Sequence, residues 1–193
     1  MMRISTISIT RGIDVMKRQI EANVAKLLLA GTPKSEVFAQ LAGQGIRDSQ
    51  LAYFIAAHVY PHRCEEHVDK VDGVITLMLF QALFAFALGY GYGIRIGPNA
   101  SWILGALSAA IPLLFVWGFY TNRVRAYNAY ILLSLIQTPK GFSDFTASPI
   151  MSSINIAIGL AMLAYVWFVR TKLFPDFGFV TPKKVKGRYV FES

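Results

Sequence analysis

Long apolar runs fill the second half of the chain, and mixed apolar and polar positions fill its first third. Three of the runs contain almost no strongly polar side chain: Gly73 to Ile94, Ser101 to Tyr120 and Pro149 to Val169. A helix needs about 20 mostly apolar residues to cross a bilayer, because its backbone groups must bond to one another where water is absent. Each run is therefore predicted to be a transmembrane helix.

A fourth and weaker run extends from Asn122 to Gln137. Arg123 and Arg125 stand in its first turn, where long cationic side chains can reach toward the headgroups. Pro139 and Gly141 follow the run and discourage further helix. We expect a short third transmembrane helix here, with a half-helix that re-enters the membrane as the alternative.

Lysine and arginine near the ends of these runs predict the orientation, because basic residues accumulate on the cytoplasmic side of short loops. With four crossings, one side carries ten basic residues and the other carries two. The ten are Arg63, Lys70, Arg123, Arg125, Arg170, Lys172, Lys183, Lys184, Lys186 and Arg188, and the two are Arg95 and Lys140. Both termini are therefore predicted to be cytoplasmic. Three crossings would leave the basic C-terminal residues outside, so the charges favour four.

The first third of the chain has the periodicity of amphipathic helices. Between Ile13 and Ala30 the apolar residues recur at steps of three and four: Ile13, Met16, Ile20, Val24, Leu27 and Leu28. This spacing places them on one face of a helix. Gly31 predicts a left-handed end to that helix. Thr32 followed by Pro33 predicts the start of a second helix, with the threonine as its cap.

The second helix is expected to end at Gly43 and Gly45, and Asp48 is the predicted cap of a third helix that runs until Pro61. The expected inward residues are Val37, Phe38 and Leu41 in the second helix and Leu51, Phe54, Ile55 and Val59 in the third. With Gly31 and Gly45 in its two joints, residues 13–60 are similar to ubiquitin-associated-like three-helix modules. The resemblance implies a small helical core and no particular ligand.

Composition agrees with a membrane protein. Of the 193 residues, 54% are apolar and 16% are charged, against roughly 25% charged in soluble domains. Only six of the 30 charged side chains lie between Gly73 and Arg170. This distribution excludes a soluble globule, a disordered chain, collagen and a disulfide-bonded secreted scaffold.

The sequence thus predicts an all-α fold: an integral membrane bundle of four transmembrane helices, the third one short, with an N-terminal cytosolic three-helix domain. The expected parts are a flexible N-terminus (1–12), the three-helix domain (13–60), a charged linker (61–72), the transmembrane block (73–170) and a basic cytosolic tail (171–193). The expected location is a bacterial inner membrane, with the lipid bilayer as a partner.

All three histidines and the single cysteine lie close together, at His58, His62, Cys64 and His67. Imidazole and thiolate groups bind zinc and copper, so these four residues are a candidate metal site. Two other interpretations stay open: a solvated linker between head and membrane, and a pH-sensitive joint. A single cysteine cannot form an internal disulfide, which agrees with a reducing cytosol.

The C-terminal segment joins aromatic residues to a basic run. It contains Phe174, Phe177 and Phe179, followed by Lys183, Lys184, Lys186 and Arg188. Phenylalanines at the headgroup layer and cations facing anionic lipid would reinforce each other. Lys186 and Gly187 also predict the turn of a small hairpin. The net charge of +8 therefore indicates lipid and no nucleic acid, for which no recognition motif is present.

Small residues one helical turn apart, Gly105 with Ala109 and Ala157 with Ala161, predict close helix packing and allow a homo-oligomer. The most polar members of the apolar runs are Gln81, Asn128 and Asn155, which are expected to bond between helices or to line a narrow path. No ionisable residue lies deep in these runs and no catalytic motif is present, so no enzyme is expected.

We therefore expect a non-enzymatic multi-pass membrane protein whose cytosolic head recruits or braces a cytosolic or membrane protein partner. Two alternatives remain. One is a small transport or channel component that responds to zinc or copper through the histidine and cysteine cluster. The other is an immunity protein against a membrane-acting toxin. Apart from the metal of the first alternative, no cofactor is expected.

Overall fold

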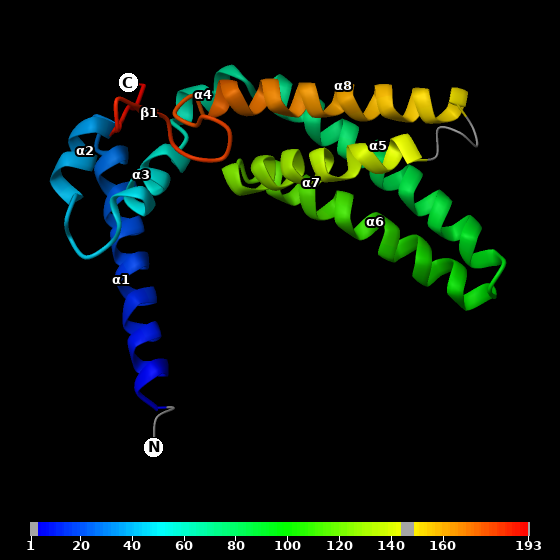
Figure 1. Cartoon of the computed structure of the whole chain (residues 1–193), viewed down its shortest axis with the longest axis horizontal. Coiled ribbons are helices and arrows are strands. Elements are labelled where there is room, and N and C mark those ends of the chain that lie inside the picture. The colour runs from blue at the N-terminus through cyan, green and yellow to red at the C-terminus, as the bar shows by residue number, and fades with distance from the viewer. Residues whose placement is uncertain (1–3, 144–148, 193) are drawn as a thin grey trace. The chain divides into compact units, whose positions relative to one another are not determined.

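The computed structural model describes residues 4–143 and 149–192. Within them the chain forms eight helices and one two-stranded hairpin (Figure 1). The elements are α1 (Ile4–Leu29), α2 (Lys34–Leu41), α3 (Asp48–Ala57), α4 (Pro61–Glu66), α5 (Val68–Ile94), α6 (Pro98–Tyr120), α7 (Val124–Ser143), α8 (Pro149–Leu173), β1 (Lys184–Val185) and β2 (Arg188–Tyr189). The predicted helical fold class is confirmed.

Packing divides the chain into two compact units. The terminal unit contains Met1–Tyr60 and Phe174–Ser193, and the membrane unit contains Pro61–Leu173. The terminal unit therefore combines the residues that precede and follow the membrane unit in the sequence. The C-terminal segment, which we expected as a separate tail from residue 171, is part of the same unit as α1–α3.

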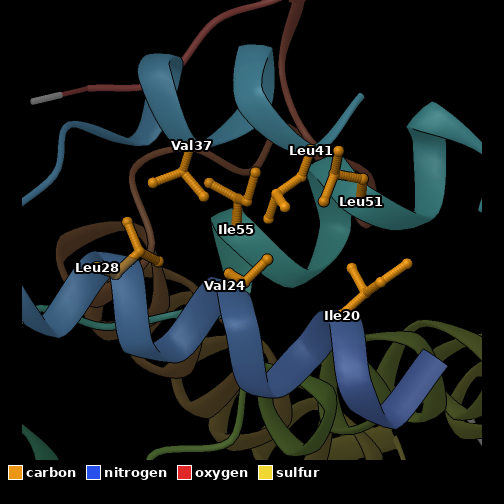
Figure 2. Close-up of a cluster of buried hydrophobic side chains, with 7 residues drawn as sticks. All are labelled: Ile20, Val24, Leu28, Val37, Leu41, Leu51 and Ile55. Carbon is orange, nitrogen blue, oxygen red and sulfur yellow. The ribbon is translucent and has the colours of Figure 1, made fainter. Parts of the chain in front are cut away.

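In the terminal unit, α1, α2 and α3 enclose one hydrophobic core (Figure 2). Its buried members are Ile20, Val24, Leu28, Val37, Leu41, Leu51 and Ile55. Within each helix they recur at steps of four, which places them on one helical face. Phe54 and Val59, also expected inside, are only half-buried, and the side chain of Ile13 lies outside the described side chains.

The helix ends of the terminal unit agree only in part with the sequence. Gly31 has a φ of 85°, which confirms the left-handed end of α1. The predicted caps are wrong: the N-cap residues are Pro33 for α2 and Arg47 for α3, and neither makes a side-chain cap hydrogen bond. Thr32 lies one residue before the cap position. Asp48 lies inside the first turn of α3, where its carboxylate still favours the helix dipole.

Two segments expected to be irregular are helical. α1 begins at Ile4, so it includes residues 4–12. The charged linker at 61–72 contains α4 and the first turn of α5. Polar side chains such as Glu65 and Glu66 suggested a solvated connection, yet glutamate is a good helix former and its charge does not prevent a helix.

The predicted C-terminal hairpin is confirmed. β1 and β2 are antiparallel, with Lys184 opposite Tyr189 and Val185 opposite Arg188. The turn residues Lys186 and Gly187 have φ values of 50° and 80°. Positive φ at both central positions is typical of the type I′ turn, whose twist suits a two-residue hairpin loop.

The membrane unit contains three helical segments that are long and apolar enough to cross a bilayer: Val68–Ile94, Asn99–Tyr120 and Ser152–Leu173. They coincide with the three strong apolar runs of the sequence. α5 and α6 pack closely as a hairpin, because glycines let the backbones approach. A Cβ atom at Gly93 would collide with the backbone of Ser101, and one at Gly89 would lie 2.5 Å from the carbonyl oxygen of Leu104.

α7 continues beyond its predicted end at Gln137. It runs to Ser143 with Pro139 inside the helix. A proline removes one backbone hydrogen bond, but α7 packs along α8 (Figure 1), and Thr138 Oγ1 donates a hydrogen bond of 2.8 Å to the carbonyl of Ser134. Among the described helices, α7 is long but too polar to qualify as a span by composition.

Candidate functional site

A buried ion pair joins the two sequence segments of the terminal unit. Lys34, the first residue of α2, places its Nζ 2.6 Å from Oδ2 of Asp176, which follows α8. Only 4% of the Lys34 side chain and none of the Asp176 side chain is exposed. The Nζ atom also lies 4.8 Å from the centre of the Tyr60 ring, within range of a cation–π interaction.

Asp176 also organises the C-terminal segment around itself. Its Oδ1 accepts a hydrogen bond of 2.6 Å from the backbone N–H of Glu192. Its carbonyl oxygen accepts one of 2.8 Å from the N–H of Lys183. Asp176 therefore holds the residue before β1 and a residue after β2, and it binds Lys34 at the same time. We call the set formed by Lys34, Tyr60, Asp176 and the N–H of Glu192 the terminal joint.

Aromatic contacts surround the terminal joint and link the same two segments. Phe38 of α2 has ring-centre distances of 5.4 Å to Tyr189 and 5.8 Å to Phe191. Tyr53 of α3 meets Phe177 edge-on at 5.4 Å. Such aromatic pairs add to the stability that burial alone gives. The C-terminal segment thus completes the core of α1–α3.

His58 lies beside the terminal joint. Its ring meets the Tyr60 ring edge-on at 6.4 Å. Burial, together with the positive charge of Lys34, lowers the pKa of His58 below its usual value. The imidazole is therefore neutral at pH 7, because protonation would bring a second charge next to a buried ammonium group.

The four candidate metal ligands belong to two different units, and the metal site that they would form stays a prediction. His58 belongs to the terminal unit, and His62, Cys64 and His67 belong to the membrane unit. Over residues 4–143 and 149–192, no group of three or more histidine, cysteine or acidic residues is arranged to hold a metal ion. Burial and the nearby Glu65 carboxylate raise the pKa of the Cys64 thiol, which disfavours the thiolate that a metal would need.

His67 takes part in a contact within the membrane unit. It is buried, and its Nδ1 atom lies 3.1 Å from Nζ of Lys70. The carbonyl oxygen of Lys70 in turn accepts a hydrogen bond of 3.3 Å from the Tyr165 hydroxyl of α8. His67 therefore belongs to the contact between the start of α5 and the later part of α8.

The four basic residues predicted to face lipid are all exposed: Lys183, Lys184, Lys186 and Arg188. Lys183 pairs with Glu192 at 3.2 Å, and Lys184 Nζ lies 4.5 Å from the centre of the Tyr189 ring. The three phenylalanines, which we expected at the headgroup layer, do not share one environment. Phe174 and Phe177 are buried in the terminal unit and only Phe179 is exposed, because the C-terminal segment packs against α2 and α3.

The residues predicted to pack helices divide into two pairs. Gly105 and Ala109 are buried, and a Cβ atom at Gly105 would lie 2.9 Å from the Phe86 ring of α5. This pair therefore serves the α5–α6 contact within one chain. Ala157 and Ala161 of α8 are exposed, so no described helix covers them.

Sequence reasoning missed Lys34 and Asp176, although one signal was available. Lys34, Val37 and Leu41 follow the three- and four-residue spacing of an inward helical face, and all three are buried. A lysine on such a face requires a buried anion. Asp176 lies 142 positions further along the chain, so this signal reveals the buried cation without identifying its anion.

Compared with protein-family models, with curated proteins and with solved structures, the chain matches none of them.

Proposed function

We propose that the protein crosses the membrane four times and that its terminal unit is a cytoplasmic head that recruits or braces a protein partner, without enzymatic activity. The observation that carries the proposal is the terminal joint. The chain leaves the terminal unit after Tyr60 and returns to it at Phe174. The contact between Lys34 and Asp176 supports a position of both flanks of the membrane unit on one side of the bilayer. Flanks on one side go with an even number of crossings, as the proposal has it.

The helix α7 is the candidate for the fourth crossing. Its 20 residues correspond to about 30 Å of helix, the thickness of a hydrocarbon core. Its polar side chains Tyr127, Asn128 and Tyr130 are buried. Its exposed residues include the aliphatic Leu132, Leu135 and Ile136 as well as the polar Arg125 and Gln137. Burial of these three polar side chains lowers the cost of placing α7 in lipid, and Arg125, in the first turn, can reach toward the headgroups.

The distribution of basic residues supports a cytoplasmic position for the head. In the four-crossing arrangement the side that holds the head also holds ten of the twelve basic residues counted above. This bias is typical of cytoplasmic loops. It supports a cytoplasmic position of both termini, and the membrane that we propose is a bacterial inner membrane.

The hairpin supports a contact between the head and lipid. Lys183, Lys184, Lys186 and Arg188 are exposed, and Val185 between them is 57% exposed. Basic residues near an anionic surface each contribute about 1 kcal/mol to binding. The hairpin would thus hold the head against the cytoplasmic leaflet.

The outer surface of α1 supports recruitment of a protein. Leu29 is 70% exposed and Val15 is 52% exposed, whereas Ile20, Val24 and Leu28 of the same helix form the core. An amphipathic helix that also carries apolar side chains on its outer face offers anchors for a partner. We propose that the partner contacts this face of α1.

The topology is tested with reporter tags on the full chain. Tags at the two termini should both report the cytoplasm, and tags inserted between α5 and α6 or between α7 and α8 should both report the opposite side. Termini on different sides would overturn the four-crossing proposal.

Recruitment is tested by cross-linking the full-length protein in its native membrane. Leu29→Glu should abolish capture of the partner, because a charge replaces an exposed apolar anchor while the core is untouched. Gln19→Glu, at an exposed polar position of the same helix, is the control and should preserve it. An identical set of captured proteins for the wild type and both variants would contradict recruitment through α1.

A further inference from the structure

Two amide side chains in the candidate spans are exposed. Gln81 lies near the middle of the 27-residue α5, and Asn155 lies in α8. Neither makes a hydrogen bond with another described residue. Serine and threonine in a span can bond to a carbonyl one turn earlier, as Ser153 does, but an exposed amide in hydrocarbon loses its hydrogen bonds to water without replacement.

α5 and α8 pack against each other near Gly73 and Tyr165. A Cβ atom at Gly73 would lie 2.5 Å from the hydroxyl oxygen of Tyr165, and the same hydroxyl bonds to the carbonyl of Lys70. Beyond this contact the two helices diverge (Figure 1). The contact fixes the depth of one helix relative to the other.

The two amides lie at nearly the same distance from that contact. Gln81 is eight residues beyond Gly73, and Asn155 is ten residues before Tyr165. At 1.5 Å per residue these separations are about 12 and 15 Å. The two helices are antiparallel, so later residues of α5 and earlier residues of α8 lie on the same side of the contact. Gln81 and Asn155 therefore differ in depth by only about 3 Å.

Both amides also lie on the helix faces that continue from the contact. On α5 the face follows steps of four and three through Gly73, Leu77, Gln81, Phe84 and Leu88. On α8 it follows Tyr165, Met162, Ile158 and Asn155. Steps that alternate between three and four produce the seam along which two helices pack. Apart from the two amides, both seams are apolar beyond the contact.

We propose that Gln81 and Asn155 form a hydrogen-bonded pair that closes α5 onto α8, and that the described arrangement is the open form of the membrane unit. An amide has both a donor and an acceptor, so the two side chains satisfy each other. The tight contact of Gly73 with Tyr165 is the pivot. Closure changes only the side of the membrane unit away from this pivot.

Cysteine cross-linking on the full chain in lipid bilayers tests the closed form. In a Cys64→Ala background, Q81C with N155C should give an intramolecular cross-link in most of the protein. The control pair is Leu83→Cys with Ala157→Cys, which lies at a similar depth on exposed positions outside both seams and should give none. Equal yields for the two pairs, or a cross-link between two copies through Q81C alone, would overturn the proposal.

Leucine substitutions give a second test that needs no cross-linker. If the amides pair, Gln81→Leu or Asn155→Leu alone should lower the thermal midpoint, because each leaves one amide unpaired. The double variant should restore it, because no unpaired group remains. A rise of the midpoint in both single variants would show that the amides face lipid and would overturn the pairing. Both tests concern the membrane unit alone, so they are independent of recruitment by the head.

Discussion

Leu51 of the terminal unit is completely buried, whereas 63% of Leu107 in the membrane unit is exposed. The same contrast holds for polar groups. Charged side chains cover the terminal unit apart from one buried pair, while the membrane unit buries Tyr127, Asn128 and Arg170. The terminal unit thus buries leucine and exposes most charged groups, whereas the membrane unit exposes leucine and buries polar groups. The exposed leucines and buried polar groups of the second unit agree with helices that are apolar enough to cross a membrane.

The largest effect is expected from breaking the terminal joint. Asp176→Ala leaves Lys34 buried without its anion, which should destabilise the terminal unit by about 3–5 kcal/mol. Hydrogen exchange of the α2 and α3 amides in the full-length protein measures the loss. The control is Lys183→Ala, which breaks the exposed pair with Glu192 and should cost about 0–1 kcal/mol. Similar losses from the two substitutions would contradict the importance of the buried pair.

Matched leucine substitutions test the contrast itself. Leu51→Ala should cost about 2–5 kcal/mol, because it opens a cavity in a packed core. Leu107→Ala should change stability much less, since lipid tails are as apolar as leucine and replace the lost contact. Unfolding of each variant is followed in detergent micelles. A large loss for Leu107→Ala would mean that another protein surface covers α6.

Two glycines of α5 sharpen the description of the membrane unit. Gly93→Ala should destabilise it by about 1–3 kcal/mol, because the added Cβ meets the backbone of α6. Gly91→Ala, two residues earlier, has open space around the new Cβ. It should be neutral or stabilising, because alanine favours a helix. The thermal midpoint should fall for Gly93→Ala and should stay the same or rise for Gly91→Ala. Equal shifts of the midpoint would refute the close α5–α6 contact.

The smallest effect on stability is expected from protonation of His58. Its pKa in the folded protein is lowered by burial and by Lys34, so the unfolded chain binds a proton more readily. The stability of the terminal unit should therefore be fully present above the unfolded pKa of about 6.5 and should decrease as the pH falls below it. His58→Asn should have a flatter pH dependence than the wild type between pH 7 and 5. Identical profiles would show that His58 titrates as an exposed histidine.

Local patterns predicted much of this fold. The three- and four-residue steps located the faces of α1–α3, the apolar run lengths located three spans, and Lys186 with Gly187 located the hairpin turn. These features depend on residues close together in the sequence. The continuation of α7 through Pro139 was missed because packing along α8 offsets the local cost of a proline.

The terminal joint depends on residues far apart in the sequence. Lys34 and Asp176 are separated by 142 positions, and no local pattern links them. The spacing of Lys34 with Val37 and Leu41 shows that a cation is buried, but it does not identify the anion. The same reason explains the expected separate tail: Phe174 and Phe177 are apolar enough for either a headgroup layer or a protein core, and only the long-range contact decides between them.

The position of Asp176 in the chain sets an order of assembly. A ribosome makes Lys34 and the helices α1–α3 first, then all of α5–α8, and only afterwards Asp176 and the aromatic residues that cover Phe38. Until those last residues emerge, Lys34 has no anion to accompany it into the interior. The head can therefore reach its final form only after every membrane helix has been synthesised, and a molecule that recognises the finished head would select chains whose translation has passed that point.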